Sequence, residues 1–293
     1  MRKRGFQTRS LLGTMVIACL FGSAALAQAL SGDEILLEVA ERGVFSSEGS
    51  VVSRIGFDLV FKDGSTAGRE FAFFGRSEPG DDELLLIYFL QPPLECGTIF
   101  LSRDSADPGA GTSLWLFLSG LGQVKELVSE ADRNASFAGS NFENDQLGGG
   151  FDLHEDYVGT LTSEEALEVD WMGASQGRTA FRVTLEERPE ADVDFPTGVV
   201  WVDRETFVVL KAEFDNASGV TEQVFTPADF VAFEDDIVPN VVVVANVLEG
   251  SETTVRTLER FRPENGFSED VFAPENLKTF DPGAFGIASD CVF

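Results

Sequence analysis

Apolar and polar residues alternate along much of the chain, which is typical of β-strands with one buried face. In the clearest run, residues 55–61, Ile55, Phe57, Leu59 and Phe61 share one side, and the turn sequence Lys-Asp-Gly-Ser follows at 62–65. Residues 84–90 are apolar on both sides, which favours a central strand covered on two faces, and Pro92-Pro93 ends that run.

The second half of the chain repeats this pattern, beginning with an alternating run at 181–186. We expect further strands at 198–203, 206–214, 219–226, 239–248 and 252–261, separated by turn-forming residues at 203–205, 215–219 and 249–251. Short strands at this spacing predict an antiparallel sheet, a sandwich or an open barrel.

Helical signals are few. An amphipathic helix is predicted over 31–42, with weaker candidates at 163–168 and in the turn near 274–277. Residues 120–150 are predicted to be loop-like and end in three consecutive glycines. A long irregular segment within a compact domain is usually functional or mobile. The fold class expected is therefore mostly β with minor α.

The N-terminus has the order of a secretory signal peptide: a basic start, an apolar run from Leu11 to about Leu26, and small residues at Ala25, Ala27 and Ala29. We expect residues 1–27 to be removed, with cleavage after Ala27 or Ala29, and 28–293 to form a single β domain in the periplasm. The alternative is a lipoprotein signal with acylation at Cys19. No linker or internal repeat divides the remainder.

The formal net charge of −29 predicts that the surface repels nucleic acid and anionic membranes. Removal of Cys19 with the signal leaves Cys96 and Cys291. An even pair in an exported protein favours a disulfide, which would tie the C-terminus to a strand near residue 96. Two free thiols are the alternative.

The residue inventory argues against most catalytic classes. The single histidine, His154, cannot supply a His-rich metal site, and there is no phosphate-binding glycine motif. We expect no metal, no cofactor and no enzymatic activity, although paired carboxylates remain open among 50 acidic residues. The 27 Phe against two Tyr indicate instead a large dry interior, filled or hollow.

The block from residue 91 to 147 carries a specific resemblance. It contains Pro92-Pro93, Gly97-Thr98-Ile99-Phe100-Leu101-Ser102, Trp115-Leu116-Phe117-Leu118, Leu121-Gly122-Gln123-Val124, Arg133 and Ser136-Phe137-Ala138-Gly139-Ser140-Asn141-Phe142, then Asp145 and Leu147. This ordered set resembles the outer-membrane lipoprotein-sorting (LolA-like) family of periplasmic proteins. Later segments agree with it, namely 201–203, 213–219 and 272–277.

The resemblance implies a strongly curved antiparallel sheet forming an open half-barrel, with helices or loops as a lid over an apolar cavity. It also implies a task, which is to shield acyl chains in the aqueous periplasm. The chain departs from the family pattern at Ser119, Glu126 and Asn141, where the family usually has Pro, a basic residue and Asp.

The resemblance and the period-two strands together give candidate site residues. A hydrophobic cavity is predicted to be lined by Phe57, Leu59, Phe71, Phe73, Leu86, Tyr88, Trp115, Phe117, Phe137 and Phe142, where the strand parity that faces inward is a hypothesis. A lid hinge is predicted at Gly139, Ser140, Asn141, Gly148, Gly149 and Gly150. A rigid plug is the alternative role for this loop.

The function expected is a monomeric carrier of a lipid or of a lipoprotein's acyl anchor, working with an inner-membrane lipid exporter or an outer-membrane acceptor. The alternative is a non-enzymatic accessory protein of an envelope lipid-export complex. A hydrolase that uses paired carboxylates is a third hypothesis, supported only by the abundance of acids.

Overall fold

The computed structural model describes residues 30–41, 49–78, 80–107, 110–149, 152–189, 191 and 193–291. The predicted signal peptide, Cys19 and the hinge candidate Gly150 lie outside the described residues. No helix among those described is long and apolar enough to cross a membrane.

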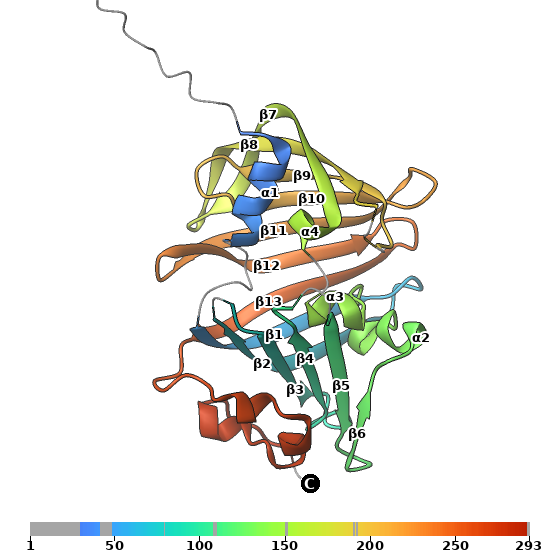
Figure 1. Ribbon diagram of the computed structural model, residues 1–293, viewed down its shortest axis with the longest axis vertical. Coiled ribbons are helices and arrows are strands. Elements are labelled where there is room, and N and C mark those ends of the chain that lie inside the picture. The colour runs from blue at the N-terminus through green and yellow to red at the C-terminus, as the bar shows by residue number, and fades with distance from the viewer. Residues whose placement is uncertain are drawn as a thin grey trace, which may run out of the picture.

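Thirteen strands make up most of the described fold (Figure 1). They are β1 Gly49–Val60, β2 Thr66–Ser77, β3 Glu83–Gln91, β4 Ile99–Asp104, β5 Thr112–Leu118, β6 Gln123–Glu126, β7 Tyr157–Trp171, β8 Ala174–Glu187, β9 Thr197–Asp203, β10 Val209–Asp215, β11 Thr221–Phe233, β12 Asp236–Asn246 and β13 Ser251–Phe261. The helices are α1 Gly32–Glu41, α2 Glu130–Arg133, α3 Asn144–Gly148 and α4 Leu153–Asp156, with 3₁₀ turns η1 Phe137–Gly139, η2 Glu269–Phe272, η3 Pro274–Thr279 and η4 Pro282–Phe285.

All thirteen strands belong to one sheet, in the order β10-β9-β8-β7-β11-β12-β13-β1-β2-β3-β4-β5-β6. Strand β10 also pairs with β11, so the β7–β11 part curls into a partial ring. The described pairings are antiparallel except β7 with β11, which meet at Trp171 and Phe230. The predicted class, a mostly β chain with a curved antiparallel sheet and few helices, is confirmed.

The five strands expected in the second half all form, within about three residues of their predicted ends except β11, which extends to Phe233 and not to 226. The helix considered at 163–168 is wrong, because those residues lie inside β7 and pair with β8 along its length. The loop-like reading of 120–150 needs correction too, since β6, α2, η1 and α3 lie within it. Pairing with β8 makes residues 163–168 a strand, and side-chain capping supports the short helices within 120–150.

Helix α1 is the amphipathic helix predicted over residues 31–42. Ser31 begins it with a capping box: the Ser31 hydroxyl accepts from the Glu34 backbone N–H at 3.2 Å, and the Glu34 carboxylate accepts from the Ser31 N–H at 2.7 Å. Ile35 and Leu36 are buried against the partial ring. Gly32 permits this contact, since a Cβ there would lie 2.3 Å from the Gly159 backbone.

Strands β1–β5 are covered on both faces (Figure 1). Residues 127–148, which we call the covering segment, pack on one face, and residues 267–291, which we call the tail segment, pack on the other. The period of two separates the faces: in β2, Phe71 and Phe73 lie under the covering segment, whereas Ala72 and Phe74 lie under the tail segment.

A disulfide between Cys96 and Cys291 fixes the end of the tail segment, which confirms the predicted pairing. Cys96 lies in the turn between β3 and β4, and the two cysteines are 195 residues apart in the sequence. The tail segment is therefore held to the sheet at its last described residue.

Candidate functional site

The covering segment is built from short capped turns held together by polar contacts. Ser129 caps α2 by accepting from the Asp132 backbone N–H at 3.2 Å. Arg133 pairs with Asp145 and donates to the Thr112 carbonyl at 3.0 Å, while Asn144 donates to the Asp132 carbonyl at 2.9 Å. These contacts join α2 to α3 and both to the end of β5.

Phe137 is the centre of the apolar cluster beneath this segment. Its side chain is 2% exposed, and its ring centroid lies 5.4 Å from Phe71 and 5.5 Å from both Phe89 and Phe100. Phe57 lies 6.3 Å away. These are the separations at which tilted and edge-to-face aromatic pairs attract one another. The covering segment thus inserts one ring into a socket of rings on the sheet.

Phe142 extends the aromatic contacts toward the partial ring. Its centroid lies 6.0 Å from Phe57 and 6.2 Å from Phe225 on β11. Phe225 in turn lies 5.7 Å from Phe214, which belongs to the cluster under α1. A continuous row of aromatic rings therefore runs from β1–β4 to the interior of the partial ring.

The structure brings some of the predicted cavity residues together and separates others. Beneath the covering segment lie Phe57, Leu59, Phe71, Phe73, Phe137 and, partly buried, Phe142. On the opposite face, under the tail segment, lie Leu86, Tyr88, Trp115 and Phe117. The predicted set is thus split by the sheet, because β3, and β5 from Leu114 onward, are apolar on both faces, so their parity could not be decided from the pattern.

The covering segment contacts residues of β3–β5 that the sequence reasoning missed. They are Ile87, Phe89, Phe100 and Leu114. Cross-strand register links three of them to predicted residues, since Phe71 pairs with Phe89 and Phe73 pairs with Ile87, which pairs with Phe100.

The predicted hinge glycines have different surroundings. Gly139 has φ +80°, a conformation that favours glycine, and lies beside Phe61. Gly148 is buried, and a Cβ there would lie 2.3 Å from Leu114. Gly149 has φ +132° and approaches Asp104 closely. Two of these glycines therefore permit close packing against β4 and β5.

Asn141 makes the polar contacts between the covering segment and the far strands. Its backbone N–H donates to Thr253 Oγ1 at 2.9 Å, and its side-chain amide donates to Ser251 Oγ at 3.1 Å. Its carbonyl accepts from Gln223 Nε2 at 3.0 Å. Ser140 beside it is buried, and its carbonyl accepts from the Ser136 hydroxyl at 2.6 Å. Of the predicted hinge residues, Asn141 therefore makes the hydrogen bonds to β11 and β13.

Glu143 is the titratable group of the covering segment with the most altered environment. Burial, followed by the nearby charges of Asp194 and Asp145, raises the pKa of Glu143 to about 7. Glu143 also caps α3. Its carboxylate form is therefore disfavoured where the covering segment is closed, and its protonated form is favoured.

We expect closure of the covering segment to weaken as the pH rises from about 4.5 to above 7. The folded pKa of Glu143 is raised above its ordinary value, so the stability it contributes is present below pH 4.5 and lost through pH 7. Hydrogen exchange of residues 136–147, corrected for intrinsic rates, should be faster at pH 8 than at pH 5.5. Glu143→Gln should abolish the difference; an equal pH dependence in this variant would contradict the assignment.

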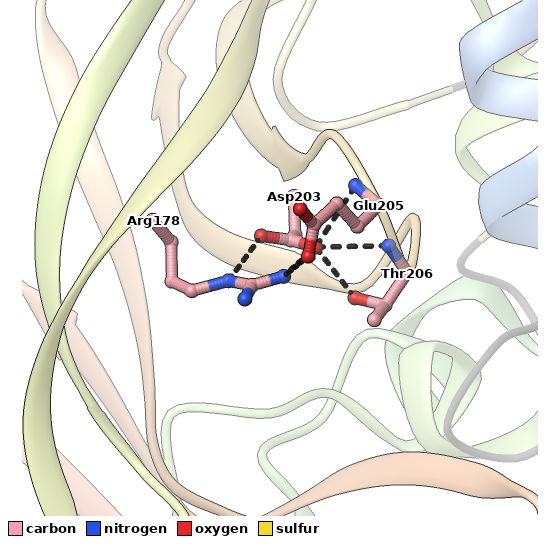
Figure 2. Close-up of polar contacts among 4 residues, drawn as sticks. All are labelled: Arg178, Asp203, Glu205 and Thr206. Atoms are coloured by element: carbon pink, nitrogen blue, oxygen red, sulfur yellow. Dashed lines mark hydrogen bonds and ion pairs between the residues drawn. The ribbon is translucent and has the colours of Figure 1, made fainter.

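A second polar cluster joins β8 to the β9–β10 turn (Figure 2). Arg178 donates to Asp203 through Nε at 2.8 Å and Nη2 at 2.9 Å, and Asp203 also accepts from the Thr206 N–H and hydroxyl, each at 2.8 Å. The Arg178 guanidinium lies 4.4 Å from the centroid of Trp171. Hydrogen bonds, chiefly from Arg178, hold the pKa of Asp203 below its usual value against the effect of burial.

The charged groups of this second cluster have partners within the chain, which indicates a structural role for the cluster. The Asp203 carboxylate is occupied by donors from three residues of the chain, as Figure 2 shows. A hollow of about 410 Å³ lies beside it, lined by Gly177, Arg178, Thr179, Asp203, Arg204 and Glu205. Among the described residues, no group of three or more His, Cys, Asp or Glu side chains is placed to hold a metal ion.

Comparisons with known proteins agree on the fold. A family model with the description "Uncharacterized protein" matches residues 81–279. No curated protein matches the chain. Among solved structures, an outer membrane lipoprotein-sorting protein domain from Vibrio parahaemolyticus is 22% identical, with a TM-score of 0.70 over 84% of this chain and 98% of that one.

Two further structures are similar. A DUF1329 family protein from Desulfovibrio piger is 18% identical, with a TM-score of 0.73 over 84% of this chain and 97% of that one. A LolA superfamily protein from Nitrosomonas europaea is 15% identical, with a TM-score of 0.62 over 84% of this chain and 98% of that one. The resemblance drawn from residues 91–147 is thereby confirmed at the level of the fold.

Proposed function

We propose a function from the premise that this chain belongs to the family matched over residues 81–279 and has the fold of the outer membrane lipoprotein-sorting (LolA-like) proteins. In this proposal, the protein is a non-enzymatic periplasmic carrier that holds a lipid, or the acyl anchor of a lipoprotein, between the sheet and the covering segment. A signal peptide at 1–27 delivers residues 28–293 to the periplasm as one domain.

The row of aromatic rings beneath the covering segment is the observation that carries this proposal. An acyl chain in water costs about 0.8 kcal/mol per CH₂, so a carrier must offer a long apolar surface. The row from Phe71 through Phe57 and Phe142 to Phe225 provides one. It also crosses from one half of the sheet to the other, as an elongated ligand would.

The covering segment acts as the lid in this proposal. Phe137 and Phe142 occupy the socket when no cargo is present, and an entering acyl chain replaces them. Asn141 makes five hydrogen bonds to β11 and β13, which an opening lid exchanges for bonds to water, since each contributes only about 1 kcal/mol net. The segment can therefore open at its Asn141 side while Arg133 holds the α2 side to β5.

Exchange with membrane partners completes the proposed cycle. The cargo would come from an inner-membrane lipid exporter and pass to an outer-membrane acceptor, with the carrier travelling as a monomer. The net charge of −29 favours partners with basic docking surfaces.

The position of Phe137 also supports a second candidate, a non-enzymatic accessory protein of an envelope lipid-export complex. In that case Phe137 is a permanent plug that fills the core, and the outer surface of the covering segment binds the partner. The two candidates differ in whether the socket ever exchanges its ring for a lipid.

We expect the purified mature protein, incubated with phospholipid vesicles, to show a stoichiometric lipid adduct in native mass spectrometry. Phe142→Asp should abolish the adduct, because it places a charge in the aromatic row. Trp115→Asp is the matched control, since Trp115 is also partly buried but packs under the tail segment. It should keep the adduct.

Two results would count against a carrier that holds its lipid beneath the covering segment. One is a wild-type protein that stays free of lipid, which favours the accessory candidate. The other is loss of the adduct in Trp115→Asp but not in Phe142→Asp, which would place the lipid on the opposite face of the sheet. Circular dichroism of each variant shows whether it is folded.

A further inference from the structure

A polar pocket lies where the covering segment meets the β1–β2 and β12–β13 turns. It has a volume of about 330 Å³ and is lined by Phe61, Lys62, Ser136, Gly139, Ser140, Asn141, Gln223, Asn246, Glu249 and Ser251. Pockets of this size accept small ligands or a single headgroup. It adjoins the apolar socket, because Phe61 packs at the edge of the cluster around Phe137.

Gln223 gives this pocket an unmet hydrogen-bonding need. The residue is 5% exposed, and its Nε2 donates to the Asn141 carbonyl at 3.0 Å. That bond fixes the orientation of the side-chain amide, because the Asn141 carbonyl can only accept. The remaining atom, Oε1, is buried and has no donor among the described residues. A buried acceptor without a donor costs free energy, so the pocket favours a ligand that brings one.

The other lining groups indicate which donor suits the pocket. Serine hydroxyls and asparagine amides predominate, and the two charged residues, Lys62 and Glu249, are exposed and opposite in sign. A single lysine on a strongly acidic protein is a poor match for a phosphate. A neutral hydroxyl supplies the donor that Gln223 Oε1 lacks without bringing a charge into the pocket. The ring of Phe61 adds an apolar surface for the C–H face of a ligand.

We propose that this pocket binds a neutral, hydroxyl-rich group, a sugar ring, with one hydroxyl donating to Gln223 Oε1. The sugar is either free or the headgroup of a lipid. In the second case the inference deepens the proposed function and rests on it, with the acyl chain in the aromatic socket and the sugar beside Asn141.

The test compares three probes on the mature, ¹⁵N-labelled protein, below any critical micelle concentration. Methyl β-glucoside carries the sugar alone, octyl β-glucoside carries sugar and chain, and octylphosphocholine carries the same chain with another headgroup. The Gln223 side-chain amide resonances should shift with both glucosides. Octyl β-glucoside should bind on the order of tenfold more tightly than octylphosphocholine, as one satisfied hydrogen bond would give.

Gln223→Leu should remove that tenfold preference and leave the affinity for octylphosphocholine unchanged. Gln123→Leu is the control, since Gln123 is an exposed glutamine on β6 outside the pocket lining. Phe61→Leu, which keeps an apolar side chain but removes the ring, should weaken the binding of both glucosides. It serves as the second variant if Gln223→Leu does not fold.

The outcomes separate the two proposals. Equal binding of both octyl probes without a shift at Gln223 overturns the sugar site and leaves the carrier standing. Binding of methyl β-glucoside, with no gain from the octyl chain, supports the sugar site and counts against the carrier. Binding of no probe at all overturns the sugar site, and lipid adducts from vesicles then decide the carrier separately.

Discussion

Phe137→Ala should lower the free energy of unfolding by about 3 to 5 kcal/mol, and an acyl ligand should restore much of that loss. The substitution empties the socket formed by Phe57, Phe71, Phe89 and Phe100. If the socket is where cargo binds, a fatty acid fills the space and stabilises the folded state. At one hundred times its dissociation constant, the gain is about 2.7 kcal/mol.

Urea unfolding with and without a long-chain fatty acid measures both effects. Phe272→Ala is the matched control, because Phe272 is also fully buried but belongs to the tail segment on the opposite face of the sheet, where it packs next to Phe267. It should cost a similar amount and recover nothing. A Phe137→Ala protein that is destabilised and gains no more from the fatty acid than Phe272→Ala would favour the permanent plug.

Asp203→Ala should also destabilise the protein by about 3 to 5 kcal/mol, through a different cause. Asp203 is fully buried, and its removal leaves the Thr206 N–H without its acceptor and the Arg178 guanidinium with only the exposed Glu205 as a carboxylate partner. Breaking one side of a buried charge pair costs far more than the pair itself contributes. Chemical unfolding monitored by tryptophan fluorescence is suitable, since Trp171 lies against Arg178.

Glu205→Ala is the internal comparison for this variant. Glu205 also pairs with Arg178, at 2.8 Å, but its side chain is 77% exposed. Solvent screening should limit its contribution to less than about 1 kcal/mol. Similar losses in the two variants would mean that burial of Asp203 has no special part in holding the β9–β10 turn.

The sequence predicted the strands well where one face is buried and the other is not. In β1, Phe57 and Leu59 alternate with polar residues or glycine, so both the strand and its inward face could be predicted. In β3 the pattern has no polar face, and Leu86 and Tyr88 were placed beside Phe71 although they lie across the sheet from it. Periodicity gives the inward face of a strand only when the other face meets water.

The features that the sequence did not predict depend on contacts between distant parts of the chain. Asn141 was recognised from its local motif, but its partners Ser251 and Thr253 come about 110 residues later. The pairing of β10 with β11 could be expected from their short turn, whereas the meeting of β7 with β11 at a single bridge could not. Helix prediction at 163–168 failed for the same reason, since β8 provides the pairing that makes this segment a strand.

The cysteine positions impose an order on biogenesis. Cys96 leaves the ribosome and crosses any membrane 195 residues ahead of Cys291, so the disulfide can form only after Cys291 has also emerged. Until then Phe74, Leu86 and the rest of the face under the tail segment lack their last covering layer. In an exported chain, the apolar face away from the covering segment would therefore be covered last. It would stay exposed to chaperones and oxidants for longer than the other face.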